Sequence, residues 1–311
     1  MSHHHAKGQH HNAKVYHVTT KKEDTAYNSI HSALPKLDTL AQLFEIGAVW
    51  LGTQRLFKQD IRLPSGSTLR VYVSTQRNDT AELSPKQIVA ETEDWLIVDK
   101  PAGLSSVPDR SHMFYNMTSA VTRYLRQQGR RYAANPITRL DLMTSGLMLY
   151  AKHSTAEKHL SKAMIQHQIR KQYTTLVAPK TLSREPQLPP CLRVRDTLSF
   201  VEKARVSPDG RDCHSLFIRH PDIHNFAHYK VVLFTGRRHQ IRCHAQHYLA
   251  PVLGDTFYGG RSHAETGIAL WASAYNFRDL SGQKQRIRLP HLAKRIQAFC
   301  ACPLTVTNAL K

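Results

Sequence analysis

The chain has 311 residues, and its 43 Lys and Arg against 23 Asp and Glu give a formal net charge of +20. A positive surplus of this size indicates a polyanionic partner, most simply nucleic acid, with a basic solvated surface of no specific role as the alternative. Hydrophobic residues make up 41% of the chain, enough for a sizeable core, and five scattered cysteines without a C-x-x-C pair argue against a disulfide framework and a zinc ribbon.

The N-terminal stretch MSHHHAKGQHHNAKVYHV lacks the apolar segment of a secretory signal. The longest apolar runs, LMLYA and VVLF, are too short to cross a bilayer, and reduced thiols are typical of cytosolic proteins. We therefore expect a cytoplasmic protein without a membrane partner. The early histidines could bind a metal, but nothing around them supplies a scaffold, so we predict a flexible, His-rich tail over residues 1–26 and assign no metal.

Residues 27–76 are predicted to form a small α/β domain. Its helix is indicated by apolar residues at roughly helical spacing, with Gly47 directly after them. A short apolar strand follows at 48–51, and alternating apolar and polar residues predict a closing strand. A polar connector over 77–87 is predicted to be a linker. The apolar positions are Leu37, Leu40, Ala41, Phe44 and Ile46 in the helix and Leu69, Val71 and Val73 in the closing strand.

Residues 88–311 are predicted to form the main, catalytic domain. WLIVDKPAG is a strand that runs into a Pro-Gly turn, and GLMLYAK, QYTTLVA, SLFIRH and HYKVVLF indicate further strands. One helix is predicted over 116–128, with Gly129 as its stop, and the capping box S-T-A-E predicts a second helix from Ser154. Strands outnumber helices without regular alternation, which favours an α+β fold with a mixed, mostly antiparallel sheet and flanking helices.

Two basic segments carry candidate functional residues. TRLDLMTSG, residues 138–146, holds a single acid, Asp141, although on spacing alone such an Asp is more often a turn or cap residue. TGRRHQIRCHAQHYLAPVLGD, residues 235–255, places several cations at a turn that enters a helix, which is a natural phosphate site. Taken alone, this second segment says only that a polyanion can bind.

Together with VDKPAGL (98–104) and KQYTTLV (171–177), these segments resemble the successive motifs of the RluA-like pseudouridine synthases. They occur in the family's order and cover most of residues 95–291, and PVLGDTFYGG and LWASAYNF continue the resemblance toward the C-terminus. Two departures are Thr138, where the family often has His, and Val107-Pro108-Asp109 after the KPAG stretch. Residues 181–227 match weakly.

The resemblance implies three active-site residues and no metal or cofactor. Asp141 matches the nucleophile, Tyr173 matches the aromatic residue that stacks on the uracil and is proposed to help remove the C5 proton, and Arg242 matches the arginine that pairs with the carboxylate. Pseudouridine formation breaks the C1′–N1 bond, rotates the base and rejoins it through C5, so it needs a nucleophile but no redox step. A guanidinium beside Asp141 would keep it ionised. The candidate RNA contacts are Lys100, Arg139, Lys171, Arg237, Arg238 and His239.

Without the resemblance, Tyr173 would be read as a sheet residue in the core and Arg242 as a phosphate contact. FEIGAVWLG and LPSGSTLRVYV resemble, more weakly, the RNA-binding domain named after ribosomal small-subunit protein four, although Ser67 stands where an acid is usual. A simple structural cap is the alternative for residues 27–76.

The sequence therefore predicts a monomeric pseudouridine synthase that isomerises specific uridines in structured RNA, either ribosomal or transfer RNA. One rival is a catalytically silent RNA-binding or RNA-chaperone protein with the same basic surface. The other is a carboxylate-based glycosidase, which needs a second acid near Asp141. No Asp or Glu lies between Asp109 and Glu157, so the second rival would need an acid from elsewhere in the fold.

Overall fold

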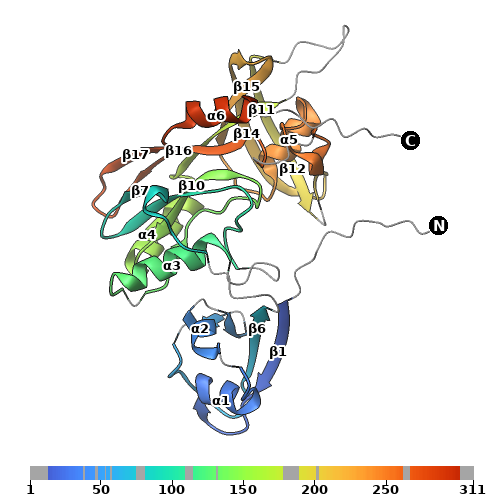
Figure 1. Ribbon diagram of the computed structural model, residues 1–311. Coiled ribbons are helices and arrows are strands. Elements are labelled where there is room, and N and C mark those ends of the chain that lie inside the picture. Colours follow the sequence, from blue (N-terminus) through green and yellow to red (C-terminus); the bar gives the residue numbers. More distant parts are fainter. Residues whose placement is uncertain are drawn as a thin grey trace, which may run out of the picture. The chain divides into compact units, whose positions relative to one another are not determined.

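The computed structural model of the chain separates into two compact units (Figure 1). Unit 1 comprises residues 1–83 and 105–134, and unit 2 comprises residues 84–104 and 135–311. The first boundary falls within the predicted linker, whose end forms the 3-10 turn η1 (Pro85–Gln87). The structure describes residues 13–37, 39–45, 48–52, 54–56, 58–74, 81–108, 115–130, 132–177, 189–200, 203–261 and 267–301.

Unit 1 contains a four-stranded antiparallel sheet in the order β1-β6-β3-β4. A separate two-stranded pair and two short helices complete its first part. The helix α1 is capped by Thr25, whose side chain accepts a hydrogen bond from the backbone N–H of Asn28 at 3.1 Å. The elements are β1 (Ala13–Thr19), β2 (Asp24–Thr25), α1 (Ala26–Ala33), α2 (Leu40–Glu45), β3 (Val49–Leu51), β4 (Gln54–Leu56), β5 (Arg62–Leu63) and β6 (Thr68–Ser74).

The core of this first part of unit 1 is made of apolar side chains that are shielded from solvent. Ile30 of α1, Phe44 of α2, and Leu69 and Val71 of β6 are all fully buried. The predicted strands at 48–51 and 69–73 are confirmed as β3 and β6. The predicted helix corresponds to α2, and the earlier helix α1 was not predicted. Ile46 and Gly47, the predicted end of the helix, lie outside the described residues.

The flexible tail predicted over residues 1–26 needs correction. Residues 1–12 lie outside the described residues, but β1 begins at Ala13 and pairs with β6 residue by residue through Thr19. Val18 is buried opposite Leu69, and Tyr16 packs against the same core, while His17 and Thr19 are exposed. This alternation is the ordinary strand period, and the surrounding histidines masked it in the sequence.

Residues 105–134 group with unit 1 rather than with the catalytic domain in which we expected them. They carry α3 (Met117–Gln127), capped by the side chain of Asn116. The helix ends near Gly129, whose φ of +78° closes it as predicted. Along the chain, this helical segment therefore comes between β8 and β9, two strands of unit 2.

Unit 2 is built on an eleven-stranded sheet, which confirms the α+β prediction. Its main path runs β13-β12-β14-β15-β11-β16-β10-β8-β7, with β17 beside β16 and β9 beside β10. Every described pairing in it is antiparallel except that of β10 with β16. The strands are β7 (Ile88–Glu91), β8 (Trp95–Lys100), β9 (Asn135–Pro136), β10 (Ser145–Ala151), β11 (Arg170–Val177), β12 (Cys191–Phe200), β13 (Ala204–Val206), β14 (Arg211–Ile223), β15 (Phe226–Leu233), β16 (Leu270–Arg278) and β17 (Lys284–Arg288).

Besides η1, the described part of unit 2 contains the helices α4 (Ser154–Ile165), α5 (Gln240–Tyr248) and α6 (Leu292–Ala301) and the 3-10 turn η2 (Thr256–Tyr258). The predicted start of α4 is right, but its cap is His153 rather than Ser154. The His153 Nδ1 accepts from the N–H of Ala156 at 3.2 Å.

The central strand β16 lies between β10 and β11, which brings together segments far apart in the sequence. Ser145 and Gly146 of β10 pair with Trp271 and Ala272 of β16. Gly146 has a φ of +110°, and a Cβ added there would lie 2.5 Å from the Ala272 carbonyl oxygen. Only glycine fits such a close approach of two backbones, so Gly146 fixes how β10 enters the sheet directly after Asp141.

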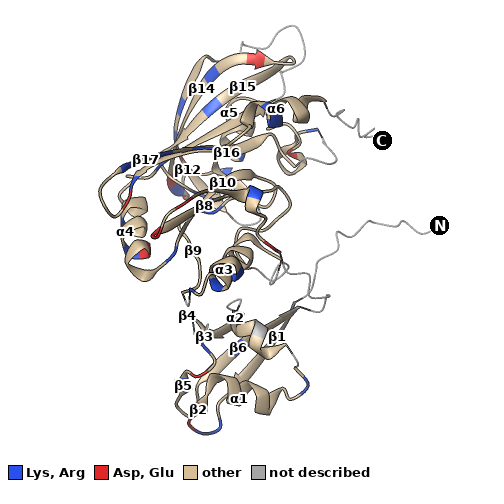
Figure 2. Ribbon diagram, turned by 60° about the vertical axis from the view of Figure 1, so that its left-hand side comes forward, with Lys and Arg blue, Asp and Glu red and all other residues tan. Residues whose placement is uncertain are grey.

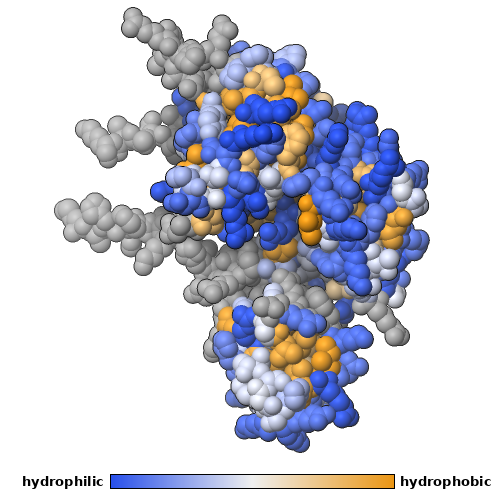
Figure 3. Space-filling model, turned by 180° about the vertical axis from the view of Figure 1, so that it is seen from behind, coloured by the Kyte–Doolittle hydropathy of each residue, from blue (hydrophilic) through white to orange (hydrophobic). Residues whose placement is uncertain are grey.

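Lys and Arg outnumber Asp and Glu along the ribbon, as Figure 2 shows. Figure 3 shows a largely polar rear face with hydrophobic patches on both units. Among the described helices, none is long and apolar enough to cross a membrane.

Candidate active site

Asp141 lies in the turn that leads into β10. Its backbone carbonyl accepts a hydrogen bond from Thr144 N at 3.1 Å, so the residue does form part of a turn. Its side chain is 22% exposed and faces two cationic or titratable side chains from the α5 region. The turn therefore presents the carboxylate to the site instead of using it as a cap.

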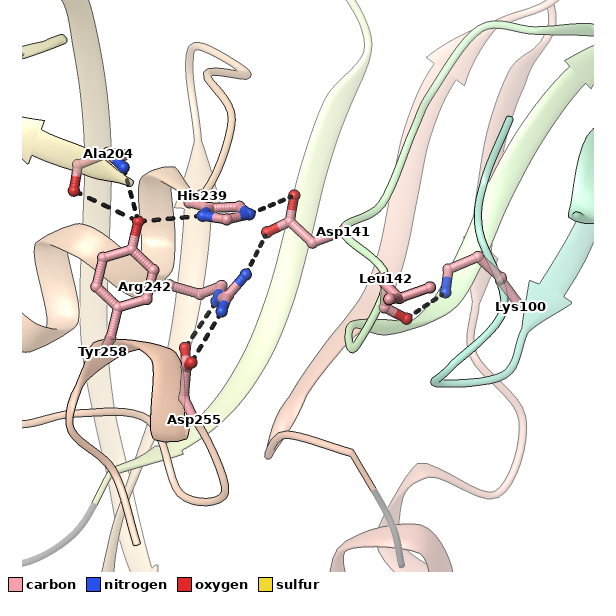
Figure 4. A network of polar contacts seen from close by, with 8 residues as sticks. All are labelled: Lys100, Asp141, Leu142, Ala204, His239, Arg242, Asp255 and Tyr258. Atoms are coloured by element: carbon pink, nitrogen blue, oxygen red, sulfur yellow. Dashed lines mark hydrogen bonds and ion pairs between the residues drawn. The ribbon is translucent and has the colours of Figure 1, made fainter. Parts of the chain in front are cut away.

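Arg242, on the first turn of α5, connects two carboxylates (Figure 4). Its Nη1 lies 3.5 Å from the Asp141 Oδ2, while its Nε and Nη2 donate to the two oxygens of Asp255 at 2.7 and 2.8 Å. Burial opposes the charge, but the hydrogen bond and attraction of Asp255, and then of Asp141, raise the pKa of Arg242 above its usual value. The bidentate pair fixes the guanidinium plane, and the third nitrogen faces Asp141.

Asp255 is thus the closer partner of Arg242, and the sequence reasoning missed it. It is 1% exposed and directly precedes η2. Its signal in the sequence was its place at the end of the basic segment 235–255, within PVLGDTFYGG. Its burial and its pairing arise from tertiary packing, which no spacing in the sequence reveals.

His239, one of the expected RNA contacts, lies beside the Asp141 carboxylate. Its side chain is 11% exposed, and its Nε2 lies 3.9 Å from the Asp141 Oδ1. Its Nδ1 lies 3.1 Å from the hydroxyl of Tyr258, which also bonds the backbone of Ala204. Burial lowers the pKa of His239, against an opposing attraction from Asp141. A mostly neutral imidazole is therefore held next to the carboxylate.

Tyr173, on β11, is 7% exposed. Burial, and then the neighbouring Tyr275 and Asp141, raise its pKa well above the usual value. Tyr275 is itself fully buried, and its hydroxyl donates to the Leu147 carbonyl at 2.7 Å. The Tyr173 hydroxyl consequently keeps its proton, so it can donate a hydrogen bond but is a poor phenolate base.

Lys100 was expected to contact RNA, and the structure corrects this. The side chain is fully buried, and its ammonium donates to the carbonyls of Pro101, Leu104 and Leu142 at 2.8, 2.7 and 3.2 Å. It cannot reach a phosphate. Instead it ties the KPAG turn to Leu142, the residue after Asp141 (Figure 4). Burial lowers its pKa to about 7, although Asp141 and Asp99 oppose the shift.

The other expected RNA contacts differ in exposure. Arg139, Arg237 and Arg238 are exposed, and the Arg238 guanidinium lies 4.2 Å from the ring centroid of Phe200. Lys171 is half-buried, and its ammonium lies so close to Gly236 that an added Cβ would be 2.8 Å away. Burial lowers the pKa of Lys171. The three arginines therefore present charge to solvent, whereas Lys171 lies against the turn before α5.

In the part of the chain that the structure describes, no three His, Cys, Asp or Glu side chains are grouped so that they could hold a metal.

Comparison with known proteins identifies the family to which this chain belongs. The family model described as RNA pseudouridylate synthase matches residues 94–247, a segment that contains Asp141, Tyr173 and Arg242. An uncharacterized RNA pseudouridine synthase of Bacillus subtilis, YjbO, is 31% identical over 212 residues, which are 68% of this chain and 74% of the relative. Ribosomal large subunit pseudouridine synthase D of Xanthomonas campestris is 30% identical over 64% of this chain and 60% of the relative.

Among solved structures, human RNA pseudouridylate synthase domain containing 4 aligns with a TM-score of 0.54 at 16% identity, over 69% of this chain and 93% of that one. At that identity the alignment supports the fold. The family model and the sequence relatives establish that the chain belongs to the RluA-type family of RNA pseudouridine synthases.

Proposed function

We propose that Asp141 is the nucleophile with which this synthase isomerises uridine, that Arg242 holds its carboxylate ionised and oriented, and that Tyr173 lies against the target base. The observation that carries the proposal is the position of the Asp141 carboxylate. It is partly exposed, it lies 3.5 Å from a guanidinium, and that guanidinium is itself held by Asp255.

This geometry suits the reaction. The carboxylate holds the sugar or base fragment while the C1′–N1 bond breaks, the uracil rotates, and a C1′–C5 bond forms. C5 then loses its proton and N1 gains one, so the product is an isomer and no redox partner is needed. Arg242 offsets the cost of keeping Asp141 ionised in a partly buried site.

The raised pKa of Tyr173 favours a stacking face and a hydrogen-bond donor over a phenolate that removes the C5 proton. Stacking also repays part of the cost of taking the uridine out of its helix.

Large-subunit ribosomal RNA is the proposed substrate, in preference to transfer RNA, because a relative named for that RNA is 30% identical to this chain. We propose that the enzyme acts in the cytoplasm as a monomer. For residues 13–74, we propose RNA binding of the kind seen in the domain named after ribosomal small-subunit protein four. Its exposed cations support this: Lys21, Lys22, Lys36, Lys58 and Arg62.

The test is Asp141→Asn on a large-subunit ribosomal RNA transcript, with pseudouridine detected by mass. The substitution keeps the shape and removes the nucleophilic charge, so product should disappear while RNA affinity changes little. Product at an appreciable rate would reject Asp141 as nucleophile. A wild-type protein that binds the RNA but forms no pseudouridine would favour the silent RNA-binding alternative.

A further inference from the structure

A partly exposed aromatic pair lies at the end of the sheet, outside the site described above. Phe234 directly follows β15, is 38% exposed, and stacks on His214 of β14. The two ring centroids are 4.3 Å apart, and the planes are inclined by 22°. The Phe234 N–H donates to the His214 carbonyl at 3.1 Å, and Thr235 Oγ1 accepts from the His214 N–H at 2.8 Å. The backbone therefore holds both rings in place.

The surroundings of this pair are cationic. Arg195 lies directly opposite His214 in the β12–β14 register, and Arg193 lies two residues along on the same face. Both are exposed, as is Arg237, whose Nε donates to the Asp212 carbonyl at 2.9 Å. Asp212 adds one negative charge to this face.

The Nε2 of the His214 ring is buried without a hydrogen-bond partner among the described residues. Burial, and then Arg195 and Arg193, lower its pKa, so the ring stays mostly neutral at pH 7. A neutral imidazole under a phenyl ring provides a flat support rather than another charge.

The stacked pair lies on the face of β14 that is turned away from α5. Along the chain it is only a few residues from His239, which lies beside Asp141. Ser215, the next residue, is buried and accepts a hydrogen bond from Gln240 of α5, so His214 points away from α5. Phe234 precedes His239 by five residues, which span at most about 18 Å, and His239 lies 3.9 Å from Asp141. The exposed Arg237 and Arg238 occupy the loop between them.

Resting on the proposed function, we infer that Phe234, supported by His214, is a stacking platform for an unpaired base of the substrate RNA, several nucleotides from the target uridine. Single-stranded RNA is recognised by aromatic faces combined with cations that follow the backbone, and this surface supplies both. Arg193, Arg195 and Arg237 are the cations that face the phosphates.

The experiment measures the affinity of the full chain for a fluorescent oligouridylate of about twelve nucleotides, a length within the range of single-strand sites. Phe234→Ala should weaken binding about fivefold or more, the lower limit for the loss of one stacked base. Phe234→Trp should bind about as tightly as wild type. Ile165→Ala, which removes an apolar side chain that is 78% exposed on α4, should have no effect.

Two further measurements separate stacking from charge. The slope of log K against log salt should be unchanged in Phe234→Ala, whereas Arg195→Gln should reduce it by about 0.7. On an abasic ribose-phosphate strand, wild type and Phe234→Ala should bind equally, because no base is present to stack.

The proposal is overturned if Phe234→Ala binds oligouridylate as tightly as wild type, or if Phe234→Leu does, since leucine offers apolar contact without a ring. Leu and Trp both fill the site, so their difference stays informative if the alanine variant folds poorly. The readout is affinity and needs no turnover. The stacking proposal can therefore be rejected while the proposed role of Asp141 holds. It can also hold if that role of Asp141 is rejected.

Discussion

The Arg242 guanidinium donates two of its hydrogen bonds to Asp255 and directs only one nitrogen to Asp141. We therefore expect the bidentate pair with Asp255 to orient the Arg242 side chain. A guanidinium without its bidentate partner could turn toward Asp141 and change the angle at which the carboxylate meets the substrate. A misplacement of about 1 Å in an active site can cost about a hundredfold in rate.

We expect Asp255→Asn to lower the single-turnover rate about 10- to 100-fold, with little change in RNA affinity. Because it breaks a buried ion pair, it should also lower the free energy of unfolding by about 3–5 kcal/mol. Asp279→Asn is the matched control, since Asp279 is a buried acid that bonds Ser281 and Gln285 in the β16–β17 turn. It should lose stability but not rate. Wild-type turnover in Asp255→Asn would mean that Arg242 needs no second carboxylate.

Lys100 predicts a pH dependence of stability. Its pKa is about 7 in the folded chain against 10.5 for an unperturbed lysine. Between these values the unfolded chain binds the extra proton and the folded chain does not, so the free energy of unfolding rises with pH from about 7 to 10.5. Below pH 7 both states carry the proton, and the full cost of burying the charge is present.

We expect urea unfolding at several pH values from 6 to 10 to show this rise in the wild type and to lack it in Lys100→Met, which is of similar size and does not titrate. Other groups that titrate in the window contribute to both proteins and cancel in the difference. Parallel stability curves for the two proteins would show that Lys100 stays protonated in the fold.

At the scale of elements, the entry of β10 into the sheet depends on Gly146. A Cβ there would lie 2.5 Å from the oxygen and 2.7 Å from the nitrogen of Ala272, and backbone atoms cannot move aside as a flexible side chain can. Gly282 has a comparable positive φ of +80° but no atom within 4 Å of an added Cβ. The two glycines therefore separate backbone strain from steric collision.

We expect Gly282→Ala to cost about 1–2 kcal/mol of stability, the usual penalty for a left-handed non-glycine residue. Gly146→Ala should cost clearly more and should also slow catalysis, because β10 begins four residues after Asp141. Thermal unfolding of both variants and one rate measurement would decide. Equal costs would mean that β10 and β16 can separate without loss.

Parts of the fold and the site were predictable from sequence, and the reasons differ. Most strands of unit 2 followed from apolar runs and alternation. The choice of Asp141, Tyr173 and Arg242 as candidate site residues followed from motifs in order, and their roles stay a prediction. The placement of Lys100 did not follow, because a lysine in a motif looks the same whether it faces phosphate or three backbone carbonyls. The strand β1 was missed because its two inward residues, Tyr16 and Val18, lie among histidines.

Unit 1 should add phosphate contacts if it binds RNA. Lys58 and Arg62 are exposed, and the ion pair of Arg62 with Glu23 is long, at 3.8 Å, and exposed on both sides. We expect the double variant Lys58→Gln/Arg62→Gln to reduce the salt slope of RNA binding by up to about 1.4–1.8, at 0.7–0.9 for each contact. Lys158→Gln/Lys284→Gln removes the same charge from exposed positions of unit 2. Equal slopes in the two double variants would favour the structural-cap reading.

The position of β16 at the centre of the sheet has a consequence for how the protein is made. During translation, Asp141 emerges 114 residues before Asp255 (255 − 141), an interval of about 6–23 s at 5–20 residues per second. Once β10 and β11 have been made, they exist without β16 (Leu270–Arg278), the strand that joins them, for the rest of this interval. Until Arg242 has been made, Asp141 has no guanidinium beside it, and until Asp255 follows, that guanidinium lacks its bidentate partner. The nascent chain is thus both catalytically silent and open along two strand edges until its last quarter is synthesised. Slowing elongation over residues 150–270 would prolong the interval in which those edges can pair with another chain.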